Sequence, residues 1–279
     1  MAAISVLMPT YNASKYVAEA IKSVLQQSFE DWELIIVDDG SIDNTNQIIR
    51  SFTDKRIKLI CNKHDFACSQ NIGLKQASGK YVARMDADDI MHPDRLKIQY
   101  KIMEEEPEIT VCGSWIKIFG NQQPCTTISS IKGKITHILR ILLKQNPIYH
   151  PTTMIRNEFL KKNFIQYGNY KYAADYKLWF DIARKGGCFF IESQPLLFYR
   201  VSDEQVSHLH AEEQQACALQ IRKEILLYWI NNNKHLKCIS LLNEAFEMAI
   251  EEKVLTEKNV CDIFDFILPK NDITSVNIP

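Results

Sequence analysis

Three carboxylates lie within four positions of one stretch of the chain, KYVARMDADDIMHPDRL at residues 80–96. Asp86, Asp88 and Asp89 follow a run whose composition is that of a buried strand. Like charges this close repel one another unless a cation or hydrogen-bond donors lie between them. Two interpretations are open from this stretch alone. The aspartates form a solvated turn or a helix N-cap, where Asp is favoured, or they bind a divalent metal ion together with a phosphorylated ligand.

The elements that would position these aspartates alternate between strands and helices. Apolar runs predict buried strands at 3–9, 32–39, 57–62 and 80–86, and one-faced apolar spacing predicts helices at 15–28, 44–53 and 68–78. This alternation is typical of βαβ units, so we expect an α/β fold with a doubly wound, mostly parallel sheet and helices on both faces.

Polar residues follow three of these strands, in the stretches PTYN (9–12), DDGS (38–41) and DADD (86–89). In open parallel sheets, ligands bind beyond the carboxyl ends of the strands. The topology therefore brings all three stretches to one rim, which favours a binding site over three unrelated turns.

The pattern changes after a helix that stops near Pro107. A strand is predicted at 109–120, followed by a polar connection and an amphipathic helix at 135–146. The segment 211–268 predicts two or three further helices, and the last residues predict a loose tail.

Composition restricts the class of protein. The chain has 279 residues, of which 46% are hydrophobic and 24% charged, enough for one large α/β domain or two ordinary ones. The formal net charge of −1 gives no overall attraction to nucleic acid, so we expect no nucleic-acid partner. The eight cysteines form no C-x-x-C pair and no Cys/His cluster with zinc spacing, which predicts free thiols in a reducing compartment.

Neither a signal peptide nor a membrane-spanning segment is predicted. The first residues, MAAISVLMPTYN, lack a basic n-region and a long apolar core. The longest candidate span, ILRILL at 138–143, is interrupted by Arg140 and is far shorter than the ~20 residues that cross a bilayer. The helix at 135–146 is basic and amphipathic, so its apolar face either packs in the core or lies on a membrane surface. We expect a cytoplasmic protein, with peripheral contact at the inner face of the membrane as the alternative.

Four separated stretches carry a resemblance to a known family, in the order SVLMPTYNASKYVAEAIKSVLQQSFEDWELIIVDDGSIDNT, GKYVARMDADDIMHPDRL, NPIYHPTTMI and ADYKLWFDIARKGG. Over roughly residues 3–207 the chain resembles family-2 inverting glycosyltransferases with the GT-A fold, of the bacterial polysaccharide and lipopolysaccharide type. The resemblance implies a donor-binding half at 1–106, an acceptor-binding and catalytic half of the same domain at 107–210, and a C-terminal helical extension at 211–279.

The activity that this resemblance implies is metal-dependent transfer of a sugar from a nucleotide donor, usually a uridine diphosphate (UDP) sugar. The acceptor is a hydroxyl of a glycan or lipid-linked glycan, and the anomeric centre is inverted. The cofactor implied is Mn²⁺ or Mg²⁺. A cation among the aspartates resolves the repulsion noted above, because hard carboxylate oxygens bind it and it offsets the charge of the leaving diphosphate.

Residue roles carry over by position in the matching motifs. Tyr11 would lie against the nucleobase and Asp39 would accept a hydrogen bond from it, with Pro9 and Asn12 beside them in the donor site. In the aspartate cluster, Asp86 would face the ribose and the metal ion, and Asp88 would bind the ion that bridges the diphosphate.

Asp175 in ADYKLW would be the catalytic base that takes the proton of the acceptor hydroxyl. Three other residues keep two interpretations each. Arg84 contacts a phosphate or pairs with a neighbouring aspartate. His150 lines the acceptor cleft or is only packed, and Trp179 stacks on a sugar or belongs to the core.

Three departures from the family pattern bear on metal affinity and donor preference. Ala174 stands where many relatives have Glu, Gln70 where many have Arg, and Ser202 where many have a His that His208 or His210 would have to replace. These departures motivate an alternative function, a nucleotide-sugar-binding module without turnover. A nucleotidyltransferase is disfavoured because PTYNASKY, after the first strand, contains no glycine.

Overall fold

The structure is a computed structural model, and it describes residues 2–121, 124–126, 131–202 and 210–232 together with six single positions between 244 and 259. The first half consists of β1 (Ile4–Thr10), α1 (Val17–Leu25), β2 (Trp32–Asp38), α2 (Thr45–Arg50), β3 (Ile57–Cys61), α3 (Phe66–Gln76), β4 (Tyr81–Arg84), β5 (Ile90–Met91) and α4 (Arg95–Glu105). Every strand and helix predicted in this half is present, with ends that differ by a few residues.

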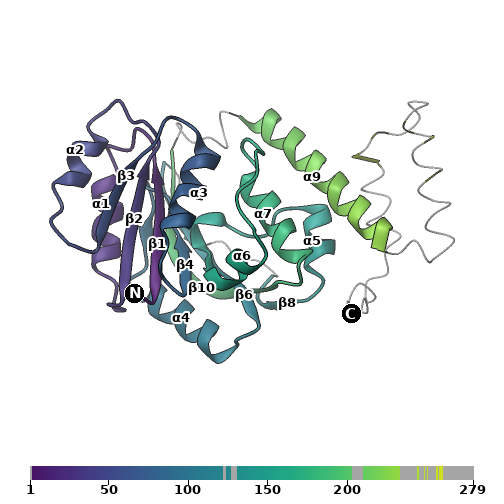
Figure 1. The fold of residues 1–279 in the computed structure, drawn as a ribbon, viewed down its shortest axis with the longest axis horizontal. Helices are drawn as coiled ribbons and strands as arrows, with labels where there is room; N and C mark the ends of the chain where they lie inside the picture. The colour runs from purple at the N-terminus through teal and green to yellow at the C-terminus, as the bar shows by residue number, and fades with distance from the viewer. Residues whose placement is uncertain are drawn as a thin grey trace.

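The second half consists of β6 (Ile109–Gly120), β7 (Cys125–Thr126), β8 (Gly133–Ile135), α5 (Ile138–Lys144), the 3₁₀ turn η1 (His150–Thr152), β9 (Met154–Arg156), α6 (Asn157–Lys162), α7 (Ala174–Ala183), β10 (Cys188–Val201) and α9 (Ala211–Asn232). The long helix α9 extends away from the sheet (Figure 1). Of the helices predicted after it, the structure describes only the six single positions, and the predicted tail and His208 lie outside the described residues.

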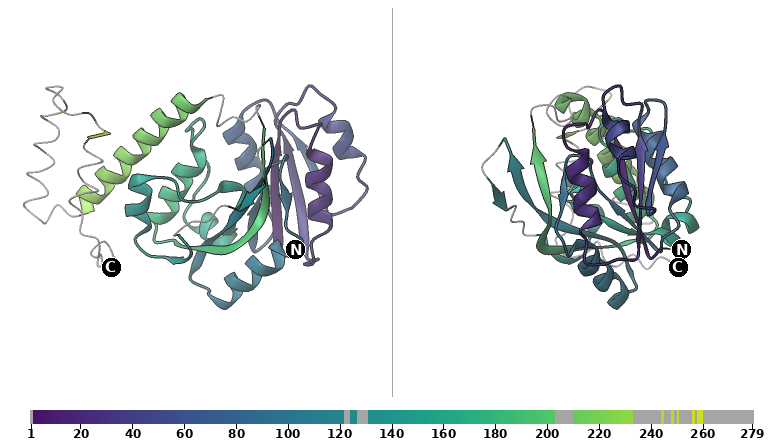
Figure 2. Two further views of the ribbon diagram at one scale, coloured as in Figure 1. Left: turned by 180° about the vertical axis from the view of Figure 1, so that it is seen from behind. Right: turned by 90° about the vertical axis from the view of Figure 1, so that its left-hand side faces the viewer.

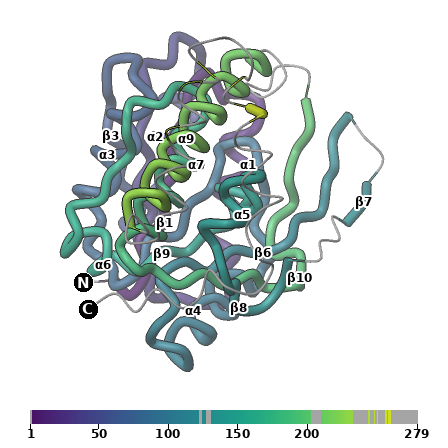
Figure 3. The backbone as a smooth tube through the Cα atoms, turned by 90° about the vertical axis from the view of Figure 1, so that its right-hand side faces the viewer, coloured from purple at the N-terminus to yellow at the C-terminus, as the bar shows by residue number. Residues whose placement is uncertain are grey.

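One sheet runs through both halves in the order β3-β2-β1-β4-β9-β6-β10-β5, with β7 paired to β6 and β8 to β10. Strands β3, β2, β1 and β4 are mutually parallel, and so are β6 and β10. The short strand β9 joins the two parallel groups by running antiparallel to both β4 and β6. The fold is therefore a mostly parallel α/β sheet of the GT-A type, as predicted. Figure 2 shows β10 curving along this sheet, and Figure 3 shows β6 and β10 side by side.

The first strands are buried on both faces, which explains their continuous apolar runs. Ile4, Val6 and Met8 of β1 pack in the cluster that contains α1, whereas Leu7 packs on the other face, towards α3. Gly73 of α3 is what allows this close approach, because a Cβ atom there would lie 2.0 Å from Leu7 Cδ1. The packing fixes the amino end of α3 above the carboxyl ends of β1 and β2.

The apolar face of α5 lies against the protein core. Leu142 and Leu143 are buried in a cluster with α7 and α9 residues, and Ile138 and Leu139 pack against it. Of the two alternatives for this helix, core burial is the one that the structure describes. Within the described residues, no helix has both the length and the apolar character needed to cross a membrane.

Candidate active site

The predicted donor site lies at the carboxyl ends of β1 and β2. Asp39 is buried, and its Oδ1 accepts hydrogen bonds from the Asp65 N–H at 2.8 Å and the Ser69 hydroxyl at 2.7 Å. Asp65 caps α3 by accepting from the Cys68 N–H. The side chain of His64 approaches the other Asp39 oxygen at 3.4 Å. The Asp39 carboxylate is thus fixed by residues at the start of α3. The sequence alone did not predict these contacts.

Tyr11 and Asn12 follow β1 at the same rim, while Pro9 is buried within the strand. The Tyr11 ring is 47% exposed and stacks on the His64 ring at a centroid distance of 4.3 Å, so its outer face is open to a planar ligand. Asn12 adopts a left-handed backbone conformation (φ 47°), and its side chain accepts from the Ile42 N–H at 3.0 Å. The loops after β1 and β2 therefore brace each other.

The aspartates occupy the loop between β4 and β5. One oxygen atom from each of Asp86, Asp88 and Asp89 lies within 4.8 Å of the others. The loop is held from β10 by Arg200, whose N–H donates to Asp89 Oδ1 at 2.9 Å and whose Nε donates to the Asp88 carbonyl at 2.8 Å. The sequence singled out Asp86 and Asp88 as individual ligands, and the structure places Asp89 in the same group.

The electrostatics of this loop fit a cation. Burial and then the charge of Asp86 raise the pKa of Asp88 to about 6, and burial together with both neighbours raises the pKa of Asp89 well above its ordinary value. Asp89 Oδ2 is buried and has no hydrogen-bond partner among the described residues. Three clustered carboxylates, one with an orphaned oxygen, are a suitable donor set for a hard divalent ion such as Mn²⁺ or Mg²⁺.

Arg84 connects this cluster to the second half of the protein. It is 2% exposed and forms an ion pair with Asp86, so the pairing interpretation holds in this structure, while its Nε has no partner among the described groups. Burial disfavours the charged form, but the charge and hydrogen bond of Asp86, with the charges of Tyr167 and Asp89, together more than offset this and raise the pKa of Arg84. The Arg84 charge therefore lies beside the aspartate cluster, with one buried donor that the described groups leave unused.

Asp175 lies in the first turn of α7, where a carboxylate is stabilised by the helix dipole. Its Oδ2 accepts a hydrogen bond from Asn146 Nδ2 at 2.8 Å. Burial raises the pKa of Asp175, and the Arg84 charge acts in the opposite direction. A carboxylate with a raised pKa is a better proton acceptor than an ordinary one. The preceding residue, Ala174, is buried in the α7 core.

Tyr167, which the sequence did not single out, lies between these groups. Its hydroxyl is 2.7 Å from His150 Nε2, and its backbone exchanges two hydrogen bonds with the Asn71 side chain, at 2.8 and 2.9 Å. After burial, the largest influences on the pKa of Tyr167 are the charges of Arg84, Asp175 and Asp86. The residue therefore links α3 to the space between the predicted base and the aspartate cluster.

The two predicted acceptor residues are placed differently from each other. Burial and the Arg84 charge lower the pKa of His150 well below its ordinary value, so the ring is neutral beside Tyr167. Trp179 is 0% exposed and packs in the core, where it meets the edge of the His150 ring. Core packing is therefore the interpretation of Trp179 that the structure describes, and its faces are not presented to a sugar.

The departures from the family pattern are also located. Gln70 is 0% exposed on α3, and both polar atoms of its amide lack a partner among the described groups. Ser202 follows β10 at its carboxyl end. His210, at the start of α9, stacks on Tyr172 at 4.2 Å and lies 3.3 Å from a Glu213 oxygen. These contacts involve α9 and the loop before α7 rather than the aspartate cluster.

The fold is of the GT-A type, and the family is shown by comparison with known proteins. The family model for glycosyl transferase family 2 matches residues 5–164. An uncharacterized glycosyltransferase of Haemophilus influenzae is 35% identical over 98% of this chain and 88% of its own length. The chain therefore belongs to glycosyl transferase family 2.

Two further proteins are similar. The Escherichia coli UDP-Glc:alpha-D-GlcNAc-diphosphoundecaprenol beta-1,3-glucosyltransferase WfgD is 32% identical over 73% of this chain and 79% of its own length. The crystal structure of Staphylococcus aureus TarS 1-349 in complex with UDP-GlcNAc superimposes with a TM-score of 0.67, at 24% identity, over 80% of this chain and 66% of that one. The likeness to TarS concerns the fold alone.

Proposed function

We propose that the protein is a metal-dependent, inverting glycosyltransferase that moves a sugar from a UDP-sugar donor to a hydroxyl of a glycan or lipid-linked glycan. Membership of family 2 supports sugar transfer. A UDP donor is supported by the name of WfgD, a glucosyltransferase that uses UDP-Glc and a diphosphoundecaprenol-linked acceptor. By this analogy we place the reaction in cell-surface polysaccharide or lipopolysaccharide synthesis, in the cytoplasm at the inner face of the membrane.

The observation that carries the proposal is the arrangement of carboxylates around Arg84. Arg84 pairs with Asp86 of the aspartate cluster, and its charge also acts on the pKa of Asp88, Asp89 and of Asp175 in α7. A single displacement with inversion needs a charge-stabilising site at the leaving diphosphate and a base on the opposite side of the sugar. The two sets of carboxylates supply these two requirements.

Each residue then has a role in the proposed reaction. When bound by Asp86, Asp88 and Asp89, a divalent cation would offset the charge of the leaving diphosphate as a Lewis acid. Tyr11 and Asp39 would hold the nucleobase, since one presents an open ring face and the other a fixed carboxylate.

Asp175, oriented by Asn146, would accept the proton of the acceptor hydroxyl while that oxygen forms the new bond to the anomeric carbon. The bond to the diphosphate oxygen breaks as this bond forms, which inverts the anomeric centre. The charge of Arg84, which is paired with Asp86, would favour the phosphate oxygens beside the cluster.

The test is thermal unfolding against a panel of nucleoside diphosphates and nucleotide sugars, with and without Mn²⁺. A ligand at ~100 times its dissociation constant stabilises the folded state by about 2.7 kcal/mol, which is readily detected. We expect a Mn²⁺-dependent shift with UDP compounds, followed by transfer from the sugars that bind. Binding without hydrolysis or transfer to any acceptor would instead support a binding module, which Ala174 and the unpartnered Gln70 amide motivate.

A further inference from the structure

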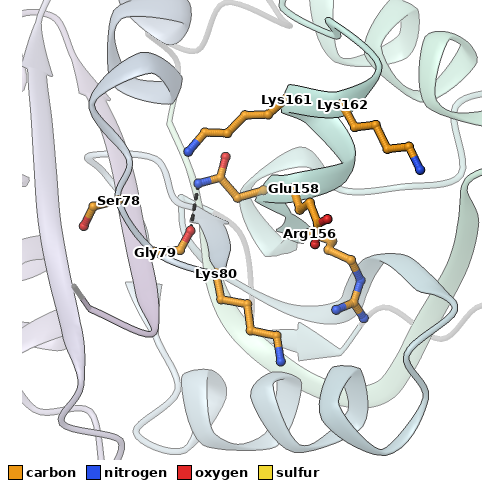
Figure 4. Close-up of a pocket in the computed structure, with 8 residues that line it drawn as sticks. Ser78, Gly79, Lys80, Arg156, Glu158, Lys161 and Lys162 are labelled. Carbon is orange, nitrogen blue, oxygen red and sulfur yellow. Dashed lines mark hydrogen bonds between the residues drawn. The ribbon is translucent and has the colours of Figure 1, made fainter.

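A second pocket lies away from the aspartate rim, at the amino end of β4. It has a volume of about 490 Å³ and is lined by Ser78, Gly79, Lys80, Arg156, Asn157, Glu158, Lys161 and Lys162 (Figure 4). Lys80 directly precedes β4, whereas Asp86 follows its carboxyl end. Lys80 and Asp86 are six residue steps apart along nearly extended chain, about 20 Å at the usual rise of a strand. The pocket is therefore distinct from the candidate active site.

Four of the eight lining residues are cationic. Lys80 is paired with Glu104 at 2.5 Å, and Arg156 is fixed by hydrogen bonds to the Ile109 and Met103 carbonyl groups. Because these carbonyl groups use its N–H donors, Arg156 contributes mainly positive charge to the pocket. With Glu158 and Glu104 counted against the four cations, the pocket keeps an excess of two positive charges.

The two lysines of α6 account for this excess. Lys161 donates to the Ala77 carbonyl at 3.3 Å, an interaction that leaves its charge uncompensated. Neither Lys161 nor Lys162 forms an ion pair with an acidic side chain in the part of the chain that the structure describes. Both lysines lie in the last turn of α6, where the helix dipole stabilises a positive charge. That role explains two cations and leaves the neighbouring aromatic residue unexplained.

Phe164 is the most exposed large hydrophobic residue among those described, at 93%. It follows the end of α6 by two residues in a left-handed backbone conformation (φ 53°), and its N–H donates to the Lys161 carbonyl at 3.3 Å. The turn thus directs an aromatic ring into solvent within one helical turn of two lysines. An exposed aromatic ring beside uncompensated cations is the composition of a surface that binds the headgroup region of a membrane.

We propose that this surface, formed by Lys80, Arg156, Lys161, Lys162 and Phe164, docks the protein on an anionic lipid bilayer. Lys161 and Lys162 bind lipid phosphates, Lys80 and Arg156 add positive charge beside them, and the Phe164 ring enters the boundary between headgroups and acyl chains. Charge complementarity and the outward ring commit the surface to a lipid phosphate rather than a soluble one, because a soluble anion gives the ring no role. The inference goes beyond the proposed reaction by naming the surface for the peripheral contact, a surface other than the α5 helix considered from the sequence.

The test is co-sedimentation of the full chain with vesicles of phosphatidylcholine alone or with 30% phosphatidylglycerol (~0.1 M salt). We expect binding only to the anionic vesicles, weakened at ~0.5 M salt. Lys162→Gln should lower the partition coefficient ~fivefold, the usual effect of one cation near such a surface. Phe164→Ser should lower it ~tenfold through lost apolar burial, and the double variant ~50-fold.

The matched control is a double variant carrying Lys185→Gln and Ile42→Ser, which also removes one exposed lysine and one exposed hydrophobic residue. It should bind anionic vesicles like the unaltered protein. Equal binding by both double variants, equal loss in both, or no preference for anionic vesicles would overturn the proposal. Release from vesicles by 1 mM inorganic phosphate at constant ionic strength would also overturn it, by assigning the pocket to a soluble anion.

A final measurement separates this proposal from the proposed reaction. The nucleotide-induced thermal shift of the Lys162→Gln/Phe164→Ser variant should equal that of the unaltered protein, since neither residue lies in the donor site. Loss of vesicle binding with an intact shift locates the membrane surface. A lost shift with intact vesicle binding would overturn the assignment of this surface as separate from the donor site.

Discussion

Glu33 and Asp89 are both buried carboxylates of one sheet, and they differ in what surrounds them. Glu33, near the amino end of β2, accepts from the hydroxyls of Ser5 and Ser78 and pairs with Lys58 at 2.6 Å. Asp89, beyond the carboxyl end of β4, has one oxygen without a partner among the described groups. Burial raises the pKa of a carboxyl group, and the partners of Glu33 reverse this and lower its pKa to about 2.

The difference separates carboxylates that stabilise the fold from carboxylates whose ionisation the fold makes unfavourable. Glu33 joins β1, β2, β3 and the turn before β4, and its charge is fully used inside the protein. At the other end, the pKa of Asp88 is raised to about 6 and that of Asp89 is also raised, so ionising these groups costs stability. Groups whose charge costs stability and that cluster at a ligand-binding rim are expected to serve binding or catalysis.

The largest expected effect concerns the carboxylate of Asp175. Asp175→Asn should reduce transfer ~10³-fold, because a positioned base contributes on that order, while the nucleotide-induced thermal shift stays unchanged. Transfer and the shift are measured on the same preparation. Asp181→Asn on the same helix is the matched control: it loses pairs with Lys177 and Arg184 and should retain transfer. A variant of Asp175 that no longer binds the donor would contradict its role as base.

The second effect concerns the aspartate cluster. Asp88→Asn should abolish the Mn²⁺-dependent part of nucleotide binding and thereby remove the ~2.7 kcal/mol of stabilisation expected at saturating ligand. Titration calorimetry with and without chelator measures this directly. Retained Mn²⁺ dependence in the variant would remove Asp88 from the metal site.

The third effect concerns Glu33, a carboxylate whose charge stabilises the fold rather than a bound ligand. Glu33→Gln should lower the free energy of unfolding by about 2 kcal/mol, because it breaks the Lys58 ion pair and weakens two hydroxyl hydrogen bonds in a buried site. Urea denaturation checks the value, and the nucleotide-induced shift should persist. Glu108→Gln, which breaks an exposed pair with Lys134, is the control and should cost less than ~0.5 kcal/mol. An equal loss in the two variants would mean that burial of Glu33 contributes nothing.

The pH dependence of stability follows from the pKa shifts of Glu33 and Asp88, which lie at opposite ends of the sheet. The pKa of Glu33 is lowered to about 2, so its stabilisation is present above about pH 4.5 and is lost as pH falls towards 2. The pKa of Asp88 is raised to about 6, so the metal-free protein loses stability as pH rises from about 4 to beyond 6. The stability gain from Asp88→Asn, measured with chelator, should therefore be near zero at pH 4 and reach about 1–3 kcal/mol at pH 7. A gain that does not change with pH would contradict the raised pKa.

Much of the fold was predictable because the first strands are buried on both faces and therefore apolar throughout. The rim was predictable for the same reason, since Asp39 and Asp86 interrupt such runs. The short strands β5 and β9 were not, because pairing partners rather than local pattern define segments of two or three residues. Tyr167 was missed for a related reason: its contacts with Asn71 and His150 span 96 and 17 positions.

The smallest expected effect tests that missed residue. Tyr167→Phe removes the hydroxyl that contacts His150 Nε2 and leaves a buried, neutral ring nitrogen unpartnered, a loss of about 1 kcal/mol. If Tyr167 positions the space between Asp175 and the aspartate cluster, kcat should fall ~tenfold while the donor Kd stays constant. Tyr170→Phe removes a hydroxyl that contacts Glu224 of α9 and should leave kcat unchanged. Equal loss of kcat in both variants would show that Tyr167 acts through general stability. Tyr167 would then have no positioning role between Asp175 and the aspartate cluster.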